Sequence, residues 1–206
     1  MRYDSAQDVY FVSNVNGNPS RKDGNGSIAR VDAATRAVTM LAEGGKNGVT
    51  LNAPKGLAIV GGTLWVADID VVRGFDTHTG KMVKTVDLSK QGAKLLNDVA
   101  AGADSALYIT DTGVAFGANG EMTHPGPDRI FRVGPDQQVS IALEGAMLAG
   151  PNGITFDAAT NRFLLAPLMA SAISTWHPGD AHPDSIAAGP GQFDGIEVLS
   201  TGQIIV

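Results

Sequence analysis

The sequence contains no cysteine, no cluster of Lys and Arg residues and no long apolar run. Without cysteine, disulfides, thiol catalysis and thiolate metal sites are excluded. The formal net charge is −6 and the basic residues are dispersed, so nucleic acid is not an expected partner. No apolar run approaches the length of a membrane span, so a membrane is not an expected partner either. The first fourteen residues lack the basic and apolar regions of a signal peptide. The compartment stays open between the cytoplasm and a periplasmic or secreted location, and the oligomeric state is also open.

The composition indicates a globular protein built from many short strands. The chain has 206 residues, of which 43% are hydrophobic, so it can bury a core. Its 26 glycines and 10 prolines are spread along the chain rather than clustered, as in proteins with many tight turns.

Four segments share one plan, in which a polar residue beside a small one opens a short strand, followed by a turn and a second strand. They are "APKGLAIVGGTLWVADID", "LLNDVAAGADSALYITDTG", "GPNGITFDAATNRFLLAPL" and "QFDGIEVLSTGQIIV". The opening polar residues are Lys55, Asn97, Asn152 and Asp194, at intervals of 42, 55 and 42 residues. The longer interval contains "VAFGANGEMTHPG", which we interpret as a loop insertion.

Within a unit, the first pair of strands is followed by a second pair of alternating apolar segments, joined by turns such as "DTHTG" and "GPDQQ". Each unit therefore has four strands, and a period near 42 with four antiparallel strands is the signature of a β-propeller blade. We predict an all-β fold with almost no helix, in which residues 1–206 form a single propeller domain. Its blades are expected to begin near residues 1, 53, 95, 150 and 192.

The first strand of a propeller blade lines the central channel, so the residues that open these strands face one another around its mouth. Asn97, Asn152 and Asp194 place three side-chain oxygens at this repeat position. Such oxygens suit a hard cation: Ca²⁺ first, with Mg²⁺, Mn²⁺ or Zn²⁺ as alternatives. The competing interpretation is that these residues, each next to Gly or Asp, only form turns.

These segments resemble the SMP-30/gluconolactonase family of six-bladed β-propellers, to which paraoxonases are more distantly related. The resemblance rests on "LNDVAAGADSALYITDTG", "PNGITFDAATNRFLL" and "FDGIEVLSTGQIIV". It implies that Asn152 and Asp194 are metal ligands, that Asp194 is also the catalytic base, and that Asn97 is a substrate-side asparagine near the metal. The sugar-lactone members carry an arginine two positions before that asparagine, and Leu95 stands there in this chain.

The resemblance also implies a glutamate ligand from the first blade, whose place falls at or just before residue 1. Six blades of this length need about 250 residues. We therefore expect the chain to be a fragment that lacks its closing blade, binds Ca²⁺ weakly on its own and shows little activity.

Several other polar residues are weaker candidates. His124, in the inserted segment, is predicted to contact substrate over the channel mouth, with simple solvent exposure as the alternative. Lys55 is expected to point into solvent, with balancing of carboxylates or contact with an anionic substrate as the alternatives. Asp68, Asp70 and Asp111, which end or follow strands, are expected toward the opposite mouth, inside the channel or capping a turn.

The sequence thus predicts a metal-dependent hydrolase of a lactone or related ester, with a small molecule as its partner. Two alternatives stay open: a phosphotriesterase-like hydrolase, and a non-catalytic binding propeller of the NHL or YVTN kind.

Overall fold

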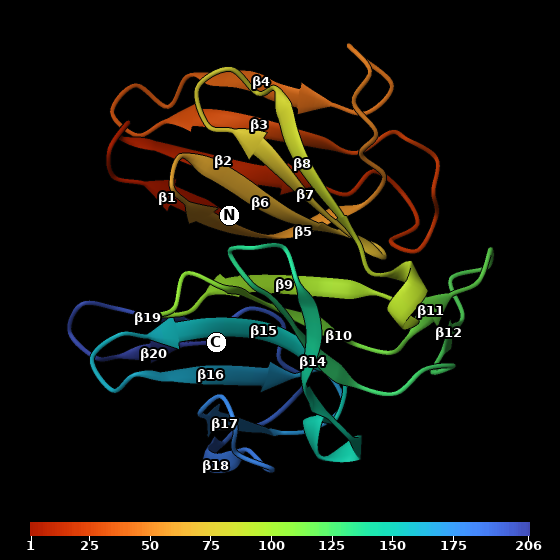
Figure 1. The fold of residues 1–206 in the computed structure, drawn as a ribbon, viewed down its shortest axis with the longest axis vertical. Coiled ribbons are helices and arrows are strands. Elements are labelled where there is room, and N and C mark those ends of the chain that lie inside the picture. The colour runs from red at the N-terminus through yellow and green to blue at the C-terminus, as the bar shows by residue number, and fades with distance from the viewer.

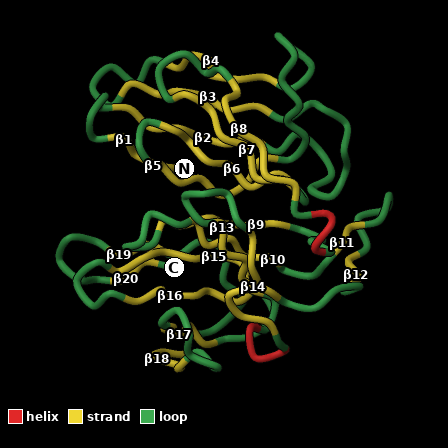
Figure 2. The backbone as a smooth tube through the Cα atoms, viewed as in Figure 1, coloured by secondary structure: helices red, strands yellow, loops and turns green.

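The fold is a ring of antiparallel sheets, described by a computed structural model for all 206 residues (Figure 1). Four sheets have four strands each, and a fifth unit consists of two short strands. The all-β propeller predicted from the sequence is confirmed. The only helical segments are single 3₁₀ turns at Ser89–Gln91 and Ala146–Leu148, shown in red in Figure 2. Neither is long or apolar enough to cross a membrane.

We number the sheets as blades I to IV in chain order, and each is a meander of neighbouring strands. Blade I consists of β1 (Arg2–Asp4), β2 (Val9–Asn14), β3 (Ser27–Asp32) and β4 (Val38–Glu43). Blade II consists of β5 (Pro54–Val60), β6 (Thr63–Asp68), β7 (Val71–Asp76) and β8 (Met82–Asp87). Blade III consists of β9 (Leu96–Ala101), β10 (Leu107–Asp111), β13 (Arg129–Val133) and β14 (Val139–Glu144). Blade IV consists of β15 (Pro151–Asp157), β16 (Arg162–Pro167), β17 (Ala172–Trp176) and β18 (Asp184–Ala188). A ribbon of β19 (Glu197–Val198) and β20 (Ile204–Ile205) follows.

The inserted segment of blade III was expected to be a plain loop, but it has secondary structure of its own. It contains a two-stranded ribbon in which β11 (Ala115–Phe116) pairs with β12 (Met122–Thr123). The Asn18 side chain, from the β2–β3 loop, donates a hydrogen bond to the Gly117 carbonyl oxygen at 2.9 Å. The ribbon therefore contacts a loop of blade I, at a distance of almost 100 residues along the chain.

Tight hairpins joining the outer strands have a local chemical cause. In the first, the Asp32 carboxylate accepts hydrogen bonds from the backbone N–H and the hydroxyl of Thr35, at 2.7 and 2.8 Å. Asp76 and Thr79 repeat this arrangement in blade II, with both distances 2.8 Å. These bonds hold the pKa of each aspartate below its ordinary value. The Asp-x-x-Thr spacing therefore encodes the turn.

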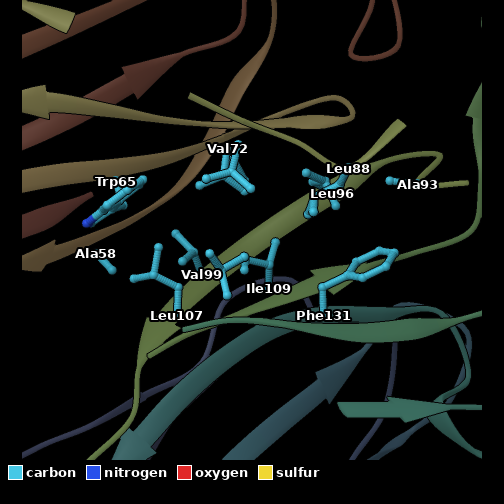
Figure 3. Packing of buried hydrophobic residues seen from close by; sticks show 13 residues of the cluster. Ala58, Trp65, Val72, Leu88, Ala93, Leu96, Val99, Leu107, Ile109 and Phe131 are labelled. Atoms are coloured by element: carbon cyan, nitrogen blue, oxygen red, sulfur yellow. The ribbon is translucent and has the colours of Figure 1, made fainter. Parts of the chain in front are cut away.

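The hydrophobic core lies between neighbouring blades rather than inside one blade. A cluster of 13 buried residues, including Trp65, Leu96 and Phe131, fills the space between blades II and III (Figure 3). Similar clusters of 9 and 10 residues lie between blades I and II and between blades III and IV, and a cluster of 4 joins blade IV to the β19–β20 ribbon. Because apolar side chains alternate along each strand, both faces of a blade contribute to such clusters.

The inner strands follow one another around the ring. β5 packs beside β9, β9 beside β15, and β15 beside β19. These are the strands that the sequence predicted to be innermost, and they bring the openings of successive blades to the same region.

Candidate functional site

Three residues occupy the same place on successive inner strands. Lys55, Asn97 and Asn152 are the second residues of β5, β9 and β15. Asp194 lies in the irregular segment before β19. A Cβ atom added to Gly153 would lie only 2.6 Å from the carbonyl oxygen of Asp194. The fifth unit therefore packs directly against the opening of blade IV.

All four residues line one cavity of about 1380 Å³. Asn152 is 5% exposed, Asn97 and Lys55 are half-buried, and Asp194 is exposed. Convergence of the three predicted oxygen donors on one point stays a prediction. The structure contains no group of three or more His, Cys, Asp or Glu side chains able to hold a metal, so a metal centre here depends on amide oxygens.

The Asn97 amide is oriented by Thr112, which directly follows β10. Its Nδ2 donates a hydrogen bond to Oγ1 of Thr112 at 3.2 Å, and Thr112 donates onward to the carbonyl oxygen of Pro151 at 3.0 Å. Because Nδ2 of Asn97 is engaged by Thr112, the side-chain oxygen of Asn97 stays available to coordinate a metal ion. This orientation matches the requirement of a cation ligand.

Asn152 and Asp194 present side-chain oxygens without a protein partner. The amide of Asn152 makes no hydrogen bond to the protein although the residue is buried, and the carboxylate of Asp194 makes neither a hydrogen bond nor an ion pair. The Asn152 amide is not among the fully buried polar atoms that lack a partner, so it is reached from the cavity and is open to a ligand or to water. Together with Asn97, the set of two amides and one carboxylate fits a hard divalent cation.

Asp98 is a cavity residue that the sequence reasoning missed. Its Oδ1 accepts a hydrogen bond from the backbone N–H of Val99 at 2.8 Å, and its Oδ2 accepts one from Ile154 of blade IV at 3.0 Å. Burial raises the pKa of Asp98 to about 6, against the opposing effect of those two hydrogen bonds. The carboxylate joins blades III and IV and adds negative charge to the cavity. An acidic residue beside Asn97 on the inner strand β9 was the signal available.

Thr110 also fastens blade III to blade IV. Its hydroxyl accepts a hydrogen bond from the Asp98 backbone N–H at 2.9 Å and donates one to the Asn152 carbonyl oxygen at 2.7 Å. Thr110 and Thr112 therefore fix the backbone of β15 relative to β9, and with it the relative positions of Asn97 and Asn152.

The position expected for Asp68 and Asp111 at the opposite mouth is wrong. Both end the second strand of a blade, which runs antiparallel to the inner strand, so they return to the mouth where the inner strand begins. Asp68 lies opposite Pro54, and Asp111 lies opposite Leu96. The Asp68 carboxylate accepts a backbone hydrogen bond from Ala53 at 2.7 Å, and Asp111 accepts one from Leu95 at 2.8 Å. These aspartates hold the entrance of each inner strand.

The solvated position expected for Lys55 is also wrong. Its Nζ donates hydrogen bonds to the carbonyl oxygens of Pro19 and Ala53, both at 3.1 Å, and the side chain lines the cavity. Burial lowers the pKa of Lys55 to about 8, with attraction to Asp68 acting in the opposite direction. Leu95, in the place of the family's arginine, is buried and apolar.

His124 is not among the residues that line the cavity. Its Nε2 lies 2.7 Å from Oδ1 of Asp128, whose Oδ2 accepts the backbone N–H of Gly150 at 2.7 Å. Asp128 thus connects the base of the inserted segment to the entrance of β15. A substrate contact by His124 stays a prediction. His78, His177 and His182 are exposed on the outer parts of the blades.

Solved structures with the same fold include proteins of different kinds. A chain in the crystal structure of a nidogen/laminin complex has a TM-score of 0.73 at 16% identity, over 96% of this chain and 67% of that one. A catalytically inactive virginiamycin B lyase from Staphylococcus aureus with quinupristin has a TM-score of 0.60 at 16% identity, over 85% and 53%. A gluconolactonase from Xanthomonas campestris has a TM-score of 0.61 at 17% identity, over 88% and 62%. This chain therefore spans about half to two thirds of those structures.

No match is found among curated protein sequences. The family described as SMP-30/Gluconolactonase/LRE-like region matches residues 5–206, which is nearly the whole chain. The repeat, the ring of blades and this match agree, and the chain belongs to the SMP-30/gluconolactonase/LRE-like region family.

Proposed function

We propose that this protein is a metal-dependent hydrolase of a lactone or a related ester. The observation that carries the proposal is that Asn97, Asn152 and Asp194 line one cavity, with side-chain oxygens that the protein itself leaves unengaged. Family membership supports the same conclusion, because the family name includes gluconolactonase.

In this proposal Asn152, Asp194 and Asn97 hold a divalent cation, most suitably Ca²⁺, with Mg²⁺, Mn²⁺ or Zn²⁺ as alternatives. Asp98 and Asp194 together bring two negative charges to the cavity, which match a divalent ion. When bound, such an ion supplies polarisation of the scissile carbonyl and a lowered pKa for water.

The chain's own residues supply proton transfer and orientation. The Asp194 carboxylate is free to accept the proton of the attacking water, because no protein group occupies its lone pairs. By accepting a hydrogen bond from Nδ2 of Asn97, Thr112 leaves the Asn97 side-chain oxygen available to a ligand. Apolar side chains in the cavity wall, among them Leu95 and Phe193, exclude competing water from the ester.

Two other functions use the same fold. A phosphotriesterase would need the same cation and a phosphoryl oxygen in place of the carbonyl. A binding propeller, as the nidogen/laminin structure illustrates for another protein, would not need unengaged oxygen donors at successive blade openings. That arrangement is the reason to favour hydrolysis.

The test is hydrolysis of γ-butyrolactone, phenyl acetate and paraoxon in Ca²⁺ and in EDTA. It uses the protein with whatever residues flank positions 1–206 in its natural chain, as do all assays below. We expect Ca²⁺-dependent turnover of the lactone or the ester and a loss of about 100-fold or more in Asp194→Asn. Asp184→Asn, an exposed outer-strand control, should behave as wild type. Turnover that persists in EDTA, or survives Asp194→Asn, would exclude the proposed mechanism. Faster hydrolysis of paraoxon would favour the phosphotriesterase.

A further inference from the structure

The cavity contains two basic side chains, Arg2 and Lys55, and only one of them is neutralised. Nη1 of Arg2 lies 3.4 Å from a carboxylate oxygen of Glu197. Lys55 has no carboxylate within ion-pair distance. The aspartates Asp68 and Asp70 are paired with Arg73 and Lys22 instead. The ammonium of Lys55 is therefore a positive charge in the cavity wall that makes no ion pair, although Asp68 attracts it from beyond ion-pair distance.

Protein contacts hold the Lys55 ammonium in position without any bound ligand. Two of its three protons are directed at the carbonyl oxygens of Pro19 and Ala53, which come from a blade I loop and from the entrance of β5. The third proton has no protein acceptor. Lys55 also shares its strand position with Asn97 and Asn152, so its head group belongs to the same ring of openings as the proposed metal ligands.

The surroundings of Lys55 strengthen any charge interaction made there. The cavity wall includes the apolar side chains of Leu57 on β5, Leu95 just before β9 and Phe116 on β11. A charge partly withdrawn from water interacts more strongly with an opposite charge than an exposed one does. Although burial lowers the pKa of Lys55 to about 8, the side chain is still mainly protonated at neutral pH.

We propose that Lys55 binds a carboxylate group of the substrate, so that the protein acts on an anionic, carboxylate-bearing lactone or ester rather than on a neutral sugar lactone. This inference rests on the proposed function for the position of the reacting carbonyl. A single free proton and a single positive charge match one carboxylate oxygen. Leu95, just before β9 on blade III, is apolar and offers no second cation to a doubly charged group. The cavity, at about 1380 Å³, has room for both ends of such a molecule.

The first experiment measures binding without catalysis. Glutarate and its neutral analogue glutaramide are titrated by calorimetry in EDTA, so that no metal ion offers a second carboxylate site. The variants are Lys55→Met, which keeps the length and removes the charge, Lys55→Arg, which keeps the charge, and Lys94→Met, a matched control at an exposed lysine outside the cavity. Thermal unfolding of each variant verifies that it is folded.

We expect glutarate to bind wild type and Lys94→Met equally and to bind Lys55→Met about tenfold or more weakly, because a charge-assisted hydrogen bond is lost. Lys55→Arg should retain part of the affinity, and glutaramide should not distinguish the variants. Equal binding of glutarate to wild type and Lys55→Met, or no binding to wild type, would overturn the inference.

The second experiment compares hydrolysis of γ-carboxy-γ-butyrolactone with that of its carboxamide. Lys55→Met should lower kcat/KM about tenfold or more for the carboxylate and leave the carboxamide unchanged. Hydrolysis of both lactones without a preference, unaffected by Lys55→Met, would overturn the inference and leave the proposed function standing. Lysine-dependent glutarate binding without hydrolysis of any ester would support the anion site and contradict the proposed function.

Discussion

Oγ1 of Thr112 accepts a hydrogen bond from Nδ2 of Asn97 at 3.2 Å, and this contact determines which end of the amide is free. Thr112 is fully buried and belongs to the segment that follows β10. The proposed ligand and the residue that orients it therefore come from different segments of one blade, and Pro151 of the next blade completes the chain of hydrogen bonds.

Thr112→Val should weaken Ca²⁺ binding by about 10- to 100-fold, the usual cost of losing an orienting partner of a metal ligand. The reason is that the Asn97 amide can then rotate. A competition titration with a fluorescent Ca²⁺ chelator measures the effect. Thr112→Ser, which retains the hydroxyl, should bind as wild type; if the valine variant also binds as wild type, the orienting role of Thr112 is refuted.

Gly56→Ala should destabilise the junction of blades II and III. A Cβ atom at Gly56 would lie 2.4 Å from Cα of Asp98, so the inner strands must separate. Such overpacking costs about 1 to 3 kcal/mol, observable as a lower urea midpoint. Gly189→Ala is the control, because its Cβ would meet Phe193 at an ordinary 3.6 Å. Equal stability of the two variants would contradict this reading of the contact.

Arg73→Met should be strongly destabilising. Nε of Arg73 donates to Oδ2 of Asp68 at 2.7 Å, and the two side chains are 8% and 0% exposed. Removing one partner of a buried pair leaves an uncompensated charge and costs about 3 to 5 kcal/mol. Lys46→Met, which breaks an exposed pair with Glu43, should cost less than about 1 kcal/mol. Chemical denaturation measures both, and a small effect of Arg73→Met would contradict the argument.

The stability of the protein should contain a contribution from Lys55 that rises with pH. Burial lowers the pKa of Lys55 from 10.5 to about 8 in the folded state. Between these values the unfolded chain holds a proton that the folded chain has released, so unfolding becomes less favourable as pH increases. From pH 7.5 to 9.5 wild type should gain about 1 to 2 kcal/mol relative to Lys55→Met. Denaturation at several pH values measures this difference. A constant difference would show that the Lys55 pKa is not lowered.

The sequence was sufficient for the architecture because the relevant signals are local and repeated. Alternating apolar residues around turns such as "DTHTG" and the recurring polar opening of the inner strand predicted the blades and placed Asn97 and Asn152 at equivalent positions. The inserted segment was recognised by its length, but its β11–β12 pairing was not, since two-residue strands carry almost no periodic signal.

Parts of the site depend on contacts between segments and could not be predicted in this way. Asp68 and Asp111 were assigned to the wrong end because the return direction of the second strand was overlooked. The inward position of Lys55 depends on the carbonyl oxygen of Pro19, from another blade. Asp98 owes its raised pKa to burial between blades, which no local pattern reveals.

The most direct test of the account is calorimetric titration of Ca²⁺ into the protein and its Asn152→Ala, Asp194→Asn and Asp184→Asn variants. We predict one binding site in wild type and in Asp184→Asn, and affinity lower by about tenfold or more in Asn152→Ala and Asp194→Asn, because each loses an oxygen ligand. If both of these variants bind Ca²⁺ as tightly as wild type, the cation is held elsewhere and the proposed metal centre at the blade openings is wrong.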